Sequence, residues 1–206
     1  MILGAGLDSF AYRRRDLLRR LWVFEVDHPA TQQWKQRRLA ELRLARPPGR
    51  VFAPVDFERQ TLREGLEEAG FDFRQLAVVS WVGVTMYLTL TAINATLARC
   101  RDGTRVVLTY NQPPEALAGM AAQIAAAFAT IAADMGEPFV TRFLPAEIAH
   151  LLHRHGFGEL TDFGPEQARA AYFQGRTDID IAAAQRLIAA TVMPALPAGE
   201  AAHGAA

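Results

Sequence analysis

A glycine turn near the start of the chain constrains the fold more than any other feature of this sequence. Ile2 and Leu3 read as the end of an apolar strand, and the segment Gly4–Asp8 (GAGLD) follows before a helical stretch. Glycine lets the backbone turn sharply and lets a ligand approach the main chain, because no β-carbon stands in the way. Short glycine turns join strands to helices in many α/β proteins, so the surrounding sequence has to indicate what this one binds.

The rest of the chain alternates apolar, β-branched segments with segments bounded by proline or glycine. The first kind is typical of buried strands and the second of helices. This alternation predicts an α/β protein with a Rossmann-like, doubly wound, mostly parallel sheet. The last two strands lie close together in the sequence and are joined by a long loop, so we expect them to add an antiparallel edge strand. Expected strands cover residues 1–3, 21–26, 50–55, 76–81, 105–110, 159–163 and 187–192, and expected helices cover residues 29–43, 62–69, 90–100, 115–135 and 145–155.

The length of 206 residues, with no internal repeat and no linker, predicts one domain. Residues 1–193 would form it, and its N-terminal segment would be absent, since the chain begins inside a core strand. Residues 194–206 are rich in Ala, Gly and Pro, which predicts a flexible tail.

Composition excludes several classes of protein. Lys and Arg together number 22, as do Asp and Glu, so no positive field favours a nucleic acid. The single cysteine, Cys100, cannot form an internal disulfide, which favours a reducing, cytoplasmic location and a buried structural thiol. The arginines from Arg13 to Arg20 are interpreted as a solvated helix face. Lys35 is the only lysine, and we interpret this skew as genome composition without functional weight.

Neither a membrane span nor a metal site is expected. Residues 76–98 and 116–133 carry no charge, but the first changes from strand-like to amphipathic and the second is dominated by weakly apolar alanine. His150, His153 and His155 cluster in the sequence, yet their spacing does not put all three on one helix face. No cysteine or run of carboxylates completes a metal site there.

Two acidic residues lie where a nucleoside would need them. The second strand ends in Glu25-Val26-Asp27, about twenty residues after the turn, where doubly wound folds place a carboxylate on ribose hydroxyls. Glu25 and Asp27 share one side of the strand, and Asp27 lies nearer its carboxyl end, so Asp27 is our candidate. Asp56 follows the third strand on the same rim and is a candidate acceptor for an adenine amino group. Asp56 is equally well explained as a helix cap or turn residue.

The neighbours of the turn disfavour a dinucleotide. The dinucleotide fingerprint requires a third glycine or alanine where Ser9 stands, and Asp8 would repel a diphosphate. An adenosine ligand without phosphate fits better, and S-adenosylmethionine is such a molecule.

These residues and further motifs resemble the leucine carboxyl methyltransferase-like family of class I S-adenosylmethionine-dependent methyltransferases, which includes many bacterial members. The resemblance extends over nearly the whole chain, and its first two motifs are fairly specific at their separation. The matching segments are LGAGLDS at 3–9 with AYR at 11–13, FEVDHP at 24–29, VDF at 55–57, GVTMYL at 83–88, TRF at 141–143 and YFQGR at 172–176.

The resemblance implies a site for the methyl donor S-adenosyl-L-methionine. The family carries a glutamate before its Gly-Val-x-Met-Tyr stretch, where this chain has Val82. The family also carries a basic helical N-terminal segment that covers the pocket, and we expect that segment to be absent here. The implied cofactor-binding residues are Gly4 and Gly6 at the methionine end, Asp27 at the ribose, and Asp56 with Phe57 at the adenine.

The expected activity is O-methylation of a carboxylate or hydroxyl of a small molecule. The protein would align the acceptor with the methyl group and exclude water. A carboxylate acceptor needs no base, whereas a hydroxyl does. Tyr87 and Tyr110 either line the acceptor pocket or are packing residues, so no catalytic residue is assigned. The alternatives are a non-catalytic remnant or fragment of such an enzyme and an NAD-type oxidoreductase, which Ser9 and Asp8 disfavour. The sequence assigns neither the acceptor nor an oligomeric state.

Overall fold

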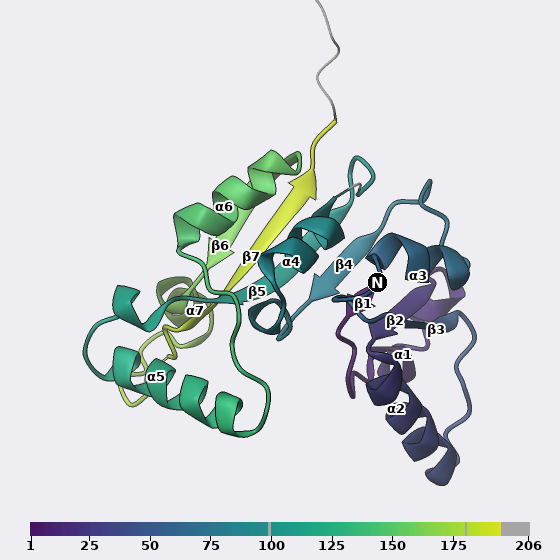
Figure 1. Cartoon of the computed structure of the whole chain (residues 1–206), viewed down its shortest axis with the longest axis horizontal. Coiled ribbons are helices and arrows are strands. Elements are labelled where there is room, and N and C mark those ends of the chain that lie inside the picture. Colours follow the sequence, from purple (N-terminus) through teal and green to yellow (C-terminus); the bar gives the residue numbers. More distant parts are fainter. Residues whose placement is uncertain (99, 180, 195–206) are drawn as a thin grey trace, which may run out of the picture.

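A computed structural model describes residues 1–98, 100–179 and 181–194 of the chain. Seven strands form one sheet in the order β3-β2-β1-β4-β5-β7-β6 (Figure 1). Apart from Pro194, the expected tail lies outside the described residues. The strands are β1 (Ile2–Leu3), β2 (Val23–Asp27), β3 (Arg50–Pro54), β4 (Val78–Trp81), β5 (Arg105–Asn111), β6 (Phe157–Phe163) and β7 (Gln185–Val192).

The expected mostly parallel, Rossmann-like sheet is confirmed. Strands β1 to β5 pair in parallel, and β7 runs antiparallel to both of its neighbours, β5 and β6. The antiparallel strand therefore lies one place inside the edge, and β6 forms the edge itself.

Helices α3, α4 and α6 cover one face of the sheet and enclose the main core (Figure 1). Leu66 and Ile93 of two of these helices are fully buried, as are Trp81 and Leu108 on the strands beneath them. A smaller cluster around Ala11 forms with α1 and the short helix that follows it. The α-helices are α1 (Phe10–Arg13), α2 (Pro29–Glu41), α3 (Leu62–Glu68), α4 (Leu90–Leu97), α5 (Gly119–Asp134), α6 (Pro145–Arg154) and α7 (Pro165–Tyr172), and the 3-10 helices are η1 (Leu17–Arg19), η2 (Thr85–Tyr87) and η3 (Pro114–Ala116).

Three expectations about helices were wrong in detail. The single helix expected over residues 115–135 is divided into η3 and α5, because Leu117 and Ala118 have extended backbone and α5 begins at Gly119 with a φ of 55°. The loop expected before β7 contains α7, whose start at Gly164 and Pro165 is a recognisable helix entry signal. Helix α1 ends at Arg13, so the basic run extends through a turn and η1, where Arg14 pairs with Asp16 at 2.8 Å.

The connection order places a crevice at the carboxyl ends of the central strands β1 and β4. From β1 the chain builds β2 and β3 on one side, and β4 and β5 lie on the other. In open α/β sheets ligands bind at the carboxyl ends of the strands at this point of divergence. Within the described residues, no helix combines the length and apolar character needed to cross a bilayer.

Candidate cofactor site

The glycine turn leaves β1 at the crevice and has a backbone that only glycine fits. Gly4 has a φ of 65° and Gly6 a φ of 41°. A β-carbon added to Gly4 would overlap the side chain of Val84, which follows β4. A β-carbon on Gly6 would have no neighbour nearer than the Gly4 carbonyl oxygen at 4.0 Å, so the space beside Gly6 is open. The turn is thus packed on one side and accessible to a ligand on the other.

Asp27 ends β2 directly beside the turn, and its carboxylate accepts two backbone hydrogen bonds. The Gly6 N–H donates to Oδ2, and the N–H of His28 donates to Oδ1 at 2.7 Å. A carboxylate offers about four lone-pair sites, so each oxygen retains capacity for a further donor. A vicinal diol, such as that of a ribose, presents two such donors. The remaining acceptor capacity of Asp27 therefore fits the ribose of the nucleoside that the sequence predicts.

Asp56 lies on the same rim, because the N–H of Val55 donates to the Asp27 carbonyl at 2.8 Å. Asp56 Oδ1 accepts the N–H of Glu58 at 3.1 Å, as expected of a turn residue. Its Oδ2 lies 3.7 Å from His28 Nε2 and 3.5 Å from Arg59 Nε. The turn role is confirmed, and the second oxygen lies near the side chains of His28 and Arg59. The two interpretations of Asp56 are compatible.

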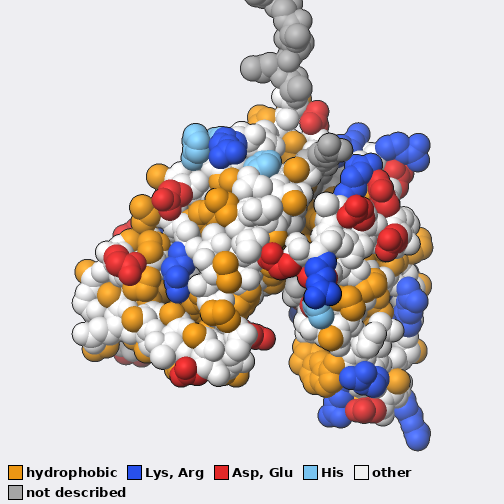
Figure 2. Space-filling view, viewed as in Figure 1, with side chains coloured by type: hydrophobic (Ala, Val, Ile, Leu, Met, Phe, Trp, Pro, Cys, Tyr) orange, Lys and Arg blue, Asp and Glu red, His pale blue; other side chains and the backbone are white. Residues whose placement is uncertain are grey.

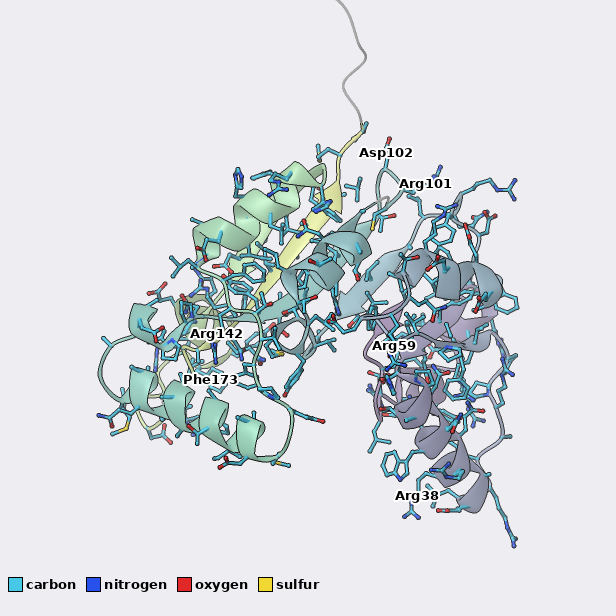
Figure 3. All side chains as sticks on the ribbon, in the orientation of Figure 1. Arg38, Arg59, Arg101, Asp102, Arg142 and Phe173 are labelled. Carbon is cyan, nitrogen blue, oxygen red and sulfur yellow. The ribbon has the colours of Figure 1, made fainter. Side chains whose placement is uncertain are left out.

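Figure 2 shows that the molecule is hollowed between the α2 side and the α5 side of this edge. Arg59 lies on one side of the hollow and Arg142 on the other (Figure 3). Phe57, next to Asp56, is half-buried and packs against the main core. The rim residue is thus anchored to the hydrophobic core on the α3 side.

A buried ionic cluster lies beneath the turn and was missed by the sequence interpretation. Glu25, which shares a strand face with Asp27, is fully buried. Its Oε2 lies 2.7 Å from Lys35 Nζ and 3.7 Å from Arg50 Nη1. Lys35, to which the sequence interpretation gave no weight, also donates to the Asp8 carbonyl at 2.8 Å. A carboxylate on an otherwise buried strand requires a cation nearby, which is the signal that could have identified Lys35.

Val82 follows β4 at the position where the family resemblance implies a glutamate. Its side chain is half exposed and cannot hydrogen-bond to a ligand. The next residue, Gly83, donates its N–H to Thr109 Oγ1 at 2.7 Å. Any polar contact from this part of the chain to a cofactor must therefore come from backbone or from other side chains.

The two candidate acceptor-lining tyrosines differ. Tyr110 is fully buried, and its hydroxyl donates to Asp162 Oδ1 at 2.9 Å. Burial, together with Asp162, raises the pKa of Tyr110 far above its usual value. Tyr87 is partly exposed and packs edge-on against Phe139, with ring centroids 5.4 Å apart. Burial and the nearby Glu137 raise the pKa of Tyr87 as well. Tyr110 is a packing residue, whereas Tyr87 remains available to a ligand.

The remaining candidate groups serve the fold. His153 Nδ1 lies 3.0 Å from the Phe157 carbonyl oxygen, and His155 Nε2 lies 2.8 Å from Asn94 Oδ1. In the part of the chain that the structure describes, no group of three His, Cys, Asp or Glu side chains could hold a metal ion.

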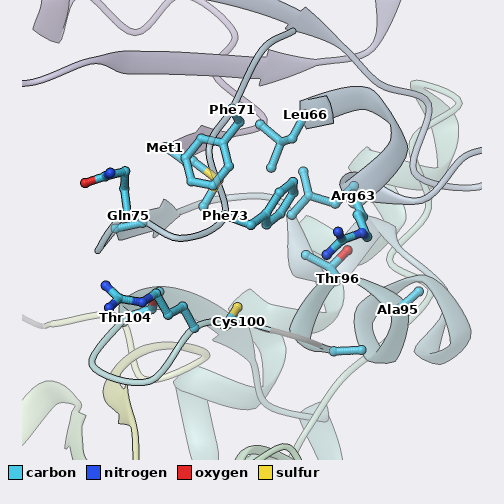
Figure 4. A pocket seen from close by; sticks show the side chains of 14 residues that line it. Met1, Arg63, Leu66, Phe71, Phe73, Gln75, Ala95, Thr96, Cys100 and Thr104 are labelled. Carbon is cyan, nitrogen blue, oxygen red and sulfur yellow. The ribbon is translucent and has the colours of Figure 1, made fainter. Parts of the chain in front are cut away.

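A small cavity at the opposite, amino-terminal edge of the sheet is lined by Met1, Leu66, Phe71, Phe73 and Cys100 (Figure 4). Burial raises the pKa of the Cys100 thiol to about 11, so it is protonated and unreactive near neutral pH. The raised pKa supports a structural thiol. The cavity lies at the other end of the strands from the crevice at their carboxyl ends.

The family model named leucine carboxyl methyltransferase matches residues 1–101, which contain the glycine turn, Asp27 and Asp56. The resemblance to the leucine carboxyl methyltransferase family is confirmed. The protein YktD of Bacillus subtilis (strain 168), named as a candidate S-adenosyl-L-methionine-dependent methyltransferase, is 32% identical over 182 residues, which are 86% of this chain and 60% of YktD. A similarly named Mycobacterium tuberculosis (strain ATCC 25618 / H37Rv) protein is 38% identical over 112 residues, 52% of this chain and 36% of that protein. The chain thus spans less than two thirds of the length of these relatives.

Solved structures share the fold at low sequence identity. Human N-acetylserotonin methyltransferase in complex with SAM superimposes with a TM-score of 0.56 at 16% identity, and the match covers 94% of this chain and 47% of the human chain. The methyltransferase domain of a bacterial Hen1 protein gives a TM-score of 0.53 at 10% identity, and 88% of that chain is covered. These matches show the Rossmann-like fold of S-adenosylmethionine-dependent methyltransferases, in agreement with the family resemblance.

Proposed function

We propose that residues 1–193 form an S-adenosyl-L-methionine-dependent methyltransferase domain. The observation that carries the proposal is the junction of the turn with β2. The Gly6 N–H meets the Asp27 carboxylate there, and open space remains beside Gly6. The names of the relatives, which refer to the same donor, support it. The single cysteine supports a cytoplasmic location.

The chain's own groups would hold the donor by its nucleoside and its amino-acid end. The free lone pairs of Asp27 would accept the ribose hydroxyls, and Asp56 with Phe57 would frame the adenine. The backbone at Gly4 and Gly6 would line the methionine end, since the space beside Gly6 is open. The bound donor supplies a methyl group already activated by its sulfonium, so the protein's task is alignment and exclusion of water.

Of the two acceptor classes, we propose a small-molecule carboxylate. A hydroxyl acceptor needs a base, and the two tyrosines at the carboxyl ends of β4 and β5 are unsuited to that role. Tyr110 is buried and bound to Asp162, and the raised pKa of Tyr87 keeps its hydroxyl protonated near neutral pH. A carboxylate is already an anionic nucleophile and needs no proton removed.

Calorimetric titration with S-adenosylhomocysteine and, separately, with NADH tests the donor assignment. Binding of S-adenosylhomocysteine alone is expected. Binding of NADH alone would overturn the proposal in favour of an oxidoreductase, and silence for both ligands would favour a non-catalytic remnant. To test the acceptor class, the protein is incubated with radiolabelled S-adenosylmethionine and a panel of carboxylic acids and phenols, and the methylated products are then treated with mild alkali. Methyl esters release methanol under these conditions, whereas ethers do not.

A further inference from the structure

We propose that Lys35 is a positioning residue that holds the glycine turn in the shape required to receive the methyl donor. This inference rests on the proposed function. Lys35 lies on α2, outside the crevice, and acts through the backbone carbonyl of Asp8. Two side chains from outside the turn bind its backbone: Asp27 accepts the Gly6 N–H, and the Lys35 ammonium donates to the Asp8 carbonyl at 2.8 Å.

The geometry around Lys35 is that of a built tether. Its side chain is 5% exposed, and its Nζ bridges Glu25 Oε2 at 2.7 Å and the Asp8 carbonyl oxygen. Helix α2 is fixed beside β2 by Gln32 as well, whose Nε2 donates to the Glu25 carbonyl at 2.9 Å. The ammonium is therefore delivered from a rigid element to a loop whose two glycines have little conformational preference of their own.

The charge of Lys35 is balanced below the turn. Glu25 is fully buried and is shared with the guanidinium of Arg50, which lies 3.9 Å from the ring centre of Phe52. Removing one partner of a buried ion pair leaves an uncompensated buried charge, which destabilises a fold strongly. The Glu25–Lys35 pair thus contributes to stability, and the Lys35–Asp8 bond contributes to the shape of the turn. These two roles can be separated by mutation.

The Asp8 carbonyl is the point where loss of the tether would affect the donor. Asp8 ends the turn, and its own carboxylate accepts the N–H of Phe10 at 2.6 Å as α1 begins. The N–H of Asp8 also donates to the Ala5 carbonyl at 2.6 Å, which closes the turn. Without Lys35, the Asp8 carbonyl would lose this partner, and the turn would be held by the Asp27 contact and by backbone hydrogen bonds such as that of the Ala5 N–H with the Val26 carbonyl at 3.0 Å. Open conformations would then compete with the one that binds.

The experiment compares four variants. Lys35→Met removes the tether and leaves Glu25 poorly compensated. The double variant Lys35→Met/Glu25→Gln removes the tether and both charges. Glu25→Gln alone disturbs the ion pair and keeps Lys35 on Asp8. Arg38→Met, at an exposed position of the same helix, is the matched control, because it removes a cation that pairs with Glu41 at the surface.

Two measurements are made on each variant: hydrogen exchange of the peptide covering residues 4–9, and the Kd for S-adenosylhomocysteine. Lys35→Met and Glu25→Gln are both expected to be less stable in urea than the wild-type protein, because each leaves a buried charge without its nearest partner, and the double variant is expected to recover part of that stability. The two variants that lack Lys35 are expected to exchange the turn amides at least tenfold faster and to bind at least tenfold more weakly. Glu25→Gln and Arg38→Met are expected to stay within about twofold of the wild-type protein in both measurements.

The exchange measurement separates the two proposals. If the wild-type protein does not bind S-adenosylhomocysteine, the proposed function fails, while faster exchange in the double variant still supports the tether. If the double variant protects residues 4–9 as well as the wild-type protein does, the positioning role is wrong. It is also wrong if the wild-type protein binds and the folded double variant binds equally well, because Lys35 would then contribute stability only.

Discussion

The side chain of Val84 occupies the space that a β-carbon on Gly4 would need. This contact joins the first turn of the chain to the segment after β4, on the opposite side of the point where the sheet topology diverges. Two independent constraints, the φ of 65° and the Val84 side chain, therefore require glycine at this position.

We expect Gly4→Ala to destabilise the protein more than Gly83→Ala. Gly83 has a φ of 76°, but a β-carbon there would meet nothing within 4 Å. Gly83→Ala should lower the free energy of unfolding only by the cost of holding alanine at a positive φ, about 1–2 kcal/mol. Gly4→Ala adds overlap with Val84, for which overpacking in a well-packed site costs about 1–3 kcal/mol. Urea denaturation followed by circular dichroism measures both. Adding Val84→Ala should restore the second contribution, and equal losses in the two single variants would show that Val84 moves aside freely.

Asp27→Ala should weaken the binding of S-adenosylhomocysteine by about 1–3 kcal/mol, the usual cost of removing a buried hydrogen-bond partner. The variant removes the acceptor proposed for the ribose and frees the N–H groups of Gly6 and His28. Isothermal titration calorimetry measures the change. Asp56→Ala is a useful comparison, because its first oxygen already serves the turn at Glu58. Unchanged affinity in Asp27→Ala would show that Asp27 does not bind the ribose.

The mostly parallel sheet and the position of the rim carboxylates could be predicted from the sequence, because they follow from short-range rules. Alternation along a strand put Glu25 and Asp27 on one face, and distance from the strand end favoured Asp27. The role of Lys35 could not be predicted in the same way. It depends on a contact between residues 8 and 35 that no local pattern encodes. The contact of Gly4 with Val84, between β1 and β4, is hidden for the same reason.

The split of the expected helix over residues 115–135 shows the opposite case. Its alanine-rich composition favours a helix throughout, although the segment contains a glycine at position 119. In the structure Leu117 and Ala118 have extended backbone and Gly119 begins α5 at a positive φ, so these three residues turn the chain between η3 and α5. A short local break therefore overrides the helix propensity of the surrounding residues.

Tyr110→Phe should lower stability without changing donor affinity. The variant removes an O–H that donates to Asp162, while Arg186 Nε remains 2.9 Å from the other oxygen of that carboxylate. A hydrogen bond to a charged group contributes about 1.5–3 kcal/mol, and the remaining Arg186 contact favours the lower end. Chemical denaturation and calorimetry with S-adenosylhomocysteine test the two statements. A large loss of donor affinity would instead place Tyr110 in the binding site.

The pKa of Tyr110 also gives this variant a pH signature. Burial favours the protonated phenol in the folded protein, so its pKa is raised above the ordinary value of about 10. Above that pH the unfolded chain releases the proton and the folded protein does not, which lowers the free energy of unfolding as pH rises. The wild-type protein should therefore lose stability above about pH 10 more steeply than Tyr110→Phe does.

His155 should make the protein less stable as pH falls below about 6.5. Burial and the neighbouring Arg154 lower the pKa of His155 in the folded protein, so the neutral ring is favoured there. As pH falls through the ordinary histidine value of about 6.5, the unfolded chain takes up a proton that the folded protein resists, and the free energy of unfolding decreases. His155→Gln keeps a side-chain amide that can reach Asn94, the partner of the ring at 2.8 Å, and has no proton to gain. Urea denaturation between pH 5 and 8 should therefore give a stability difference, wild type minus variant, that shrinks toward low pH. A constant difference across this range would show that His155 titrates alike in both states.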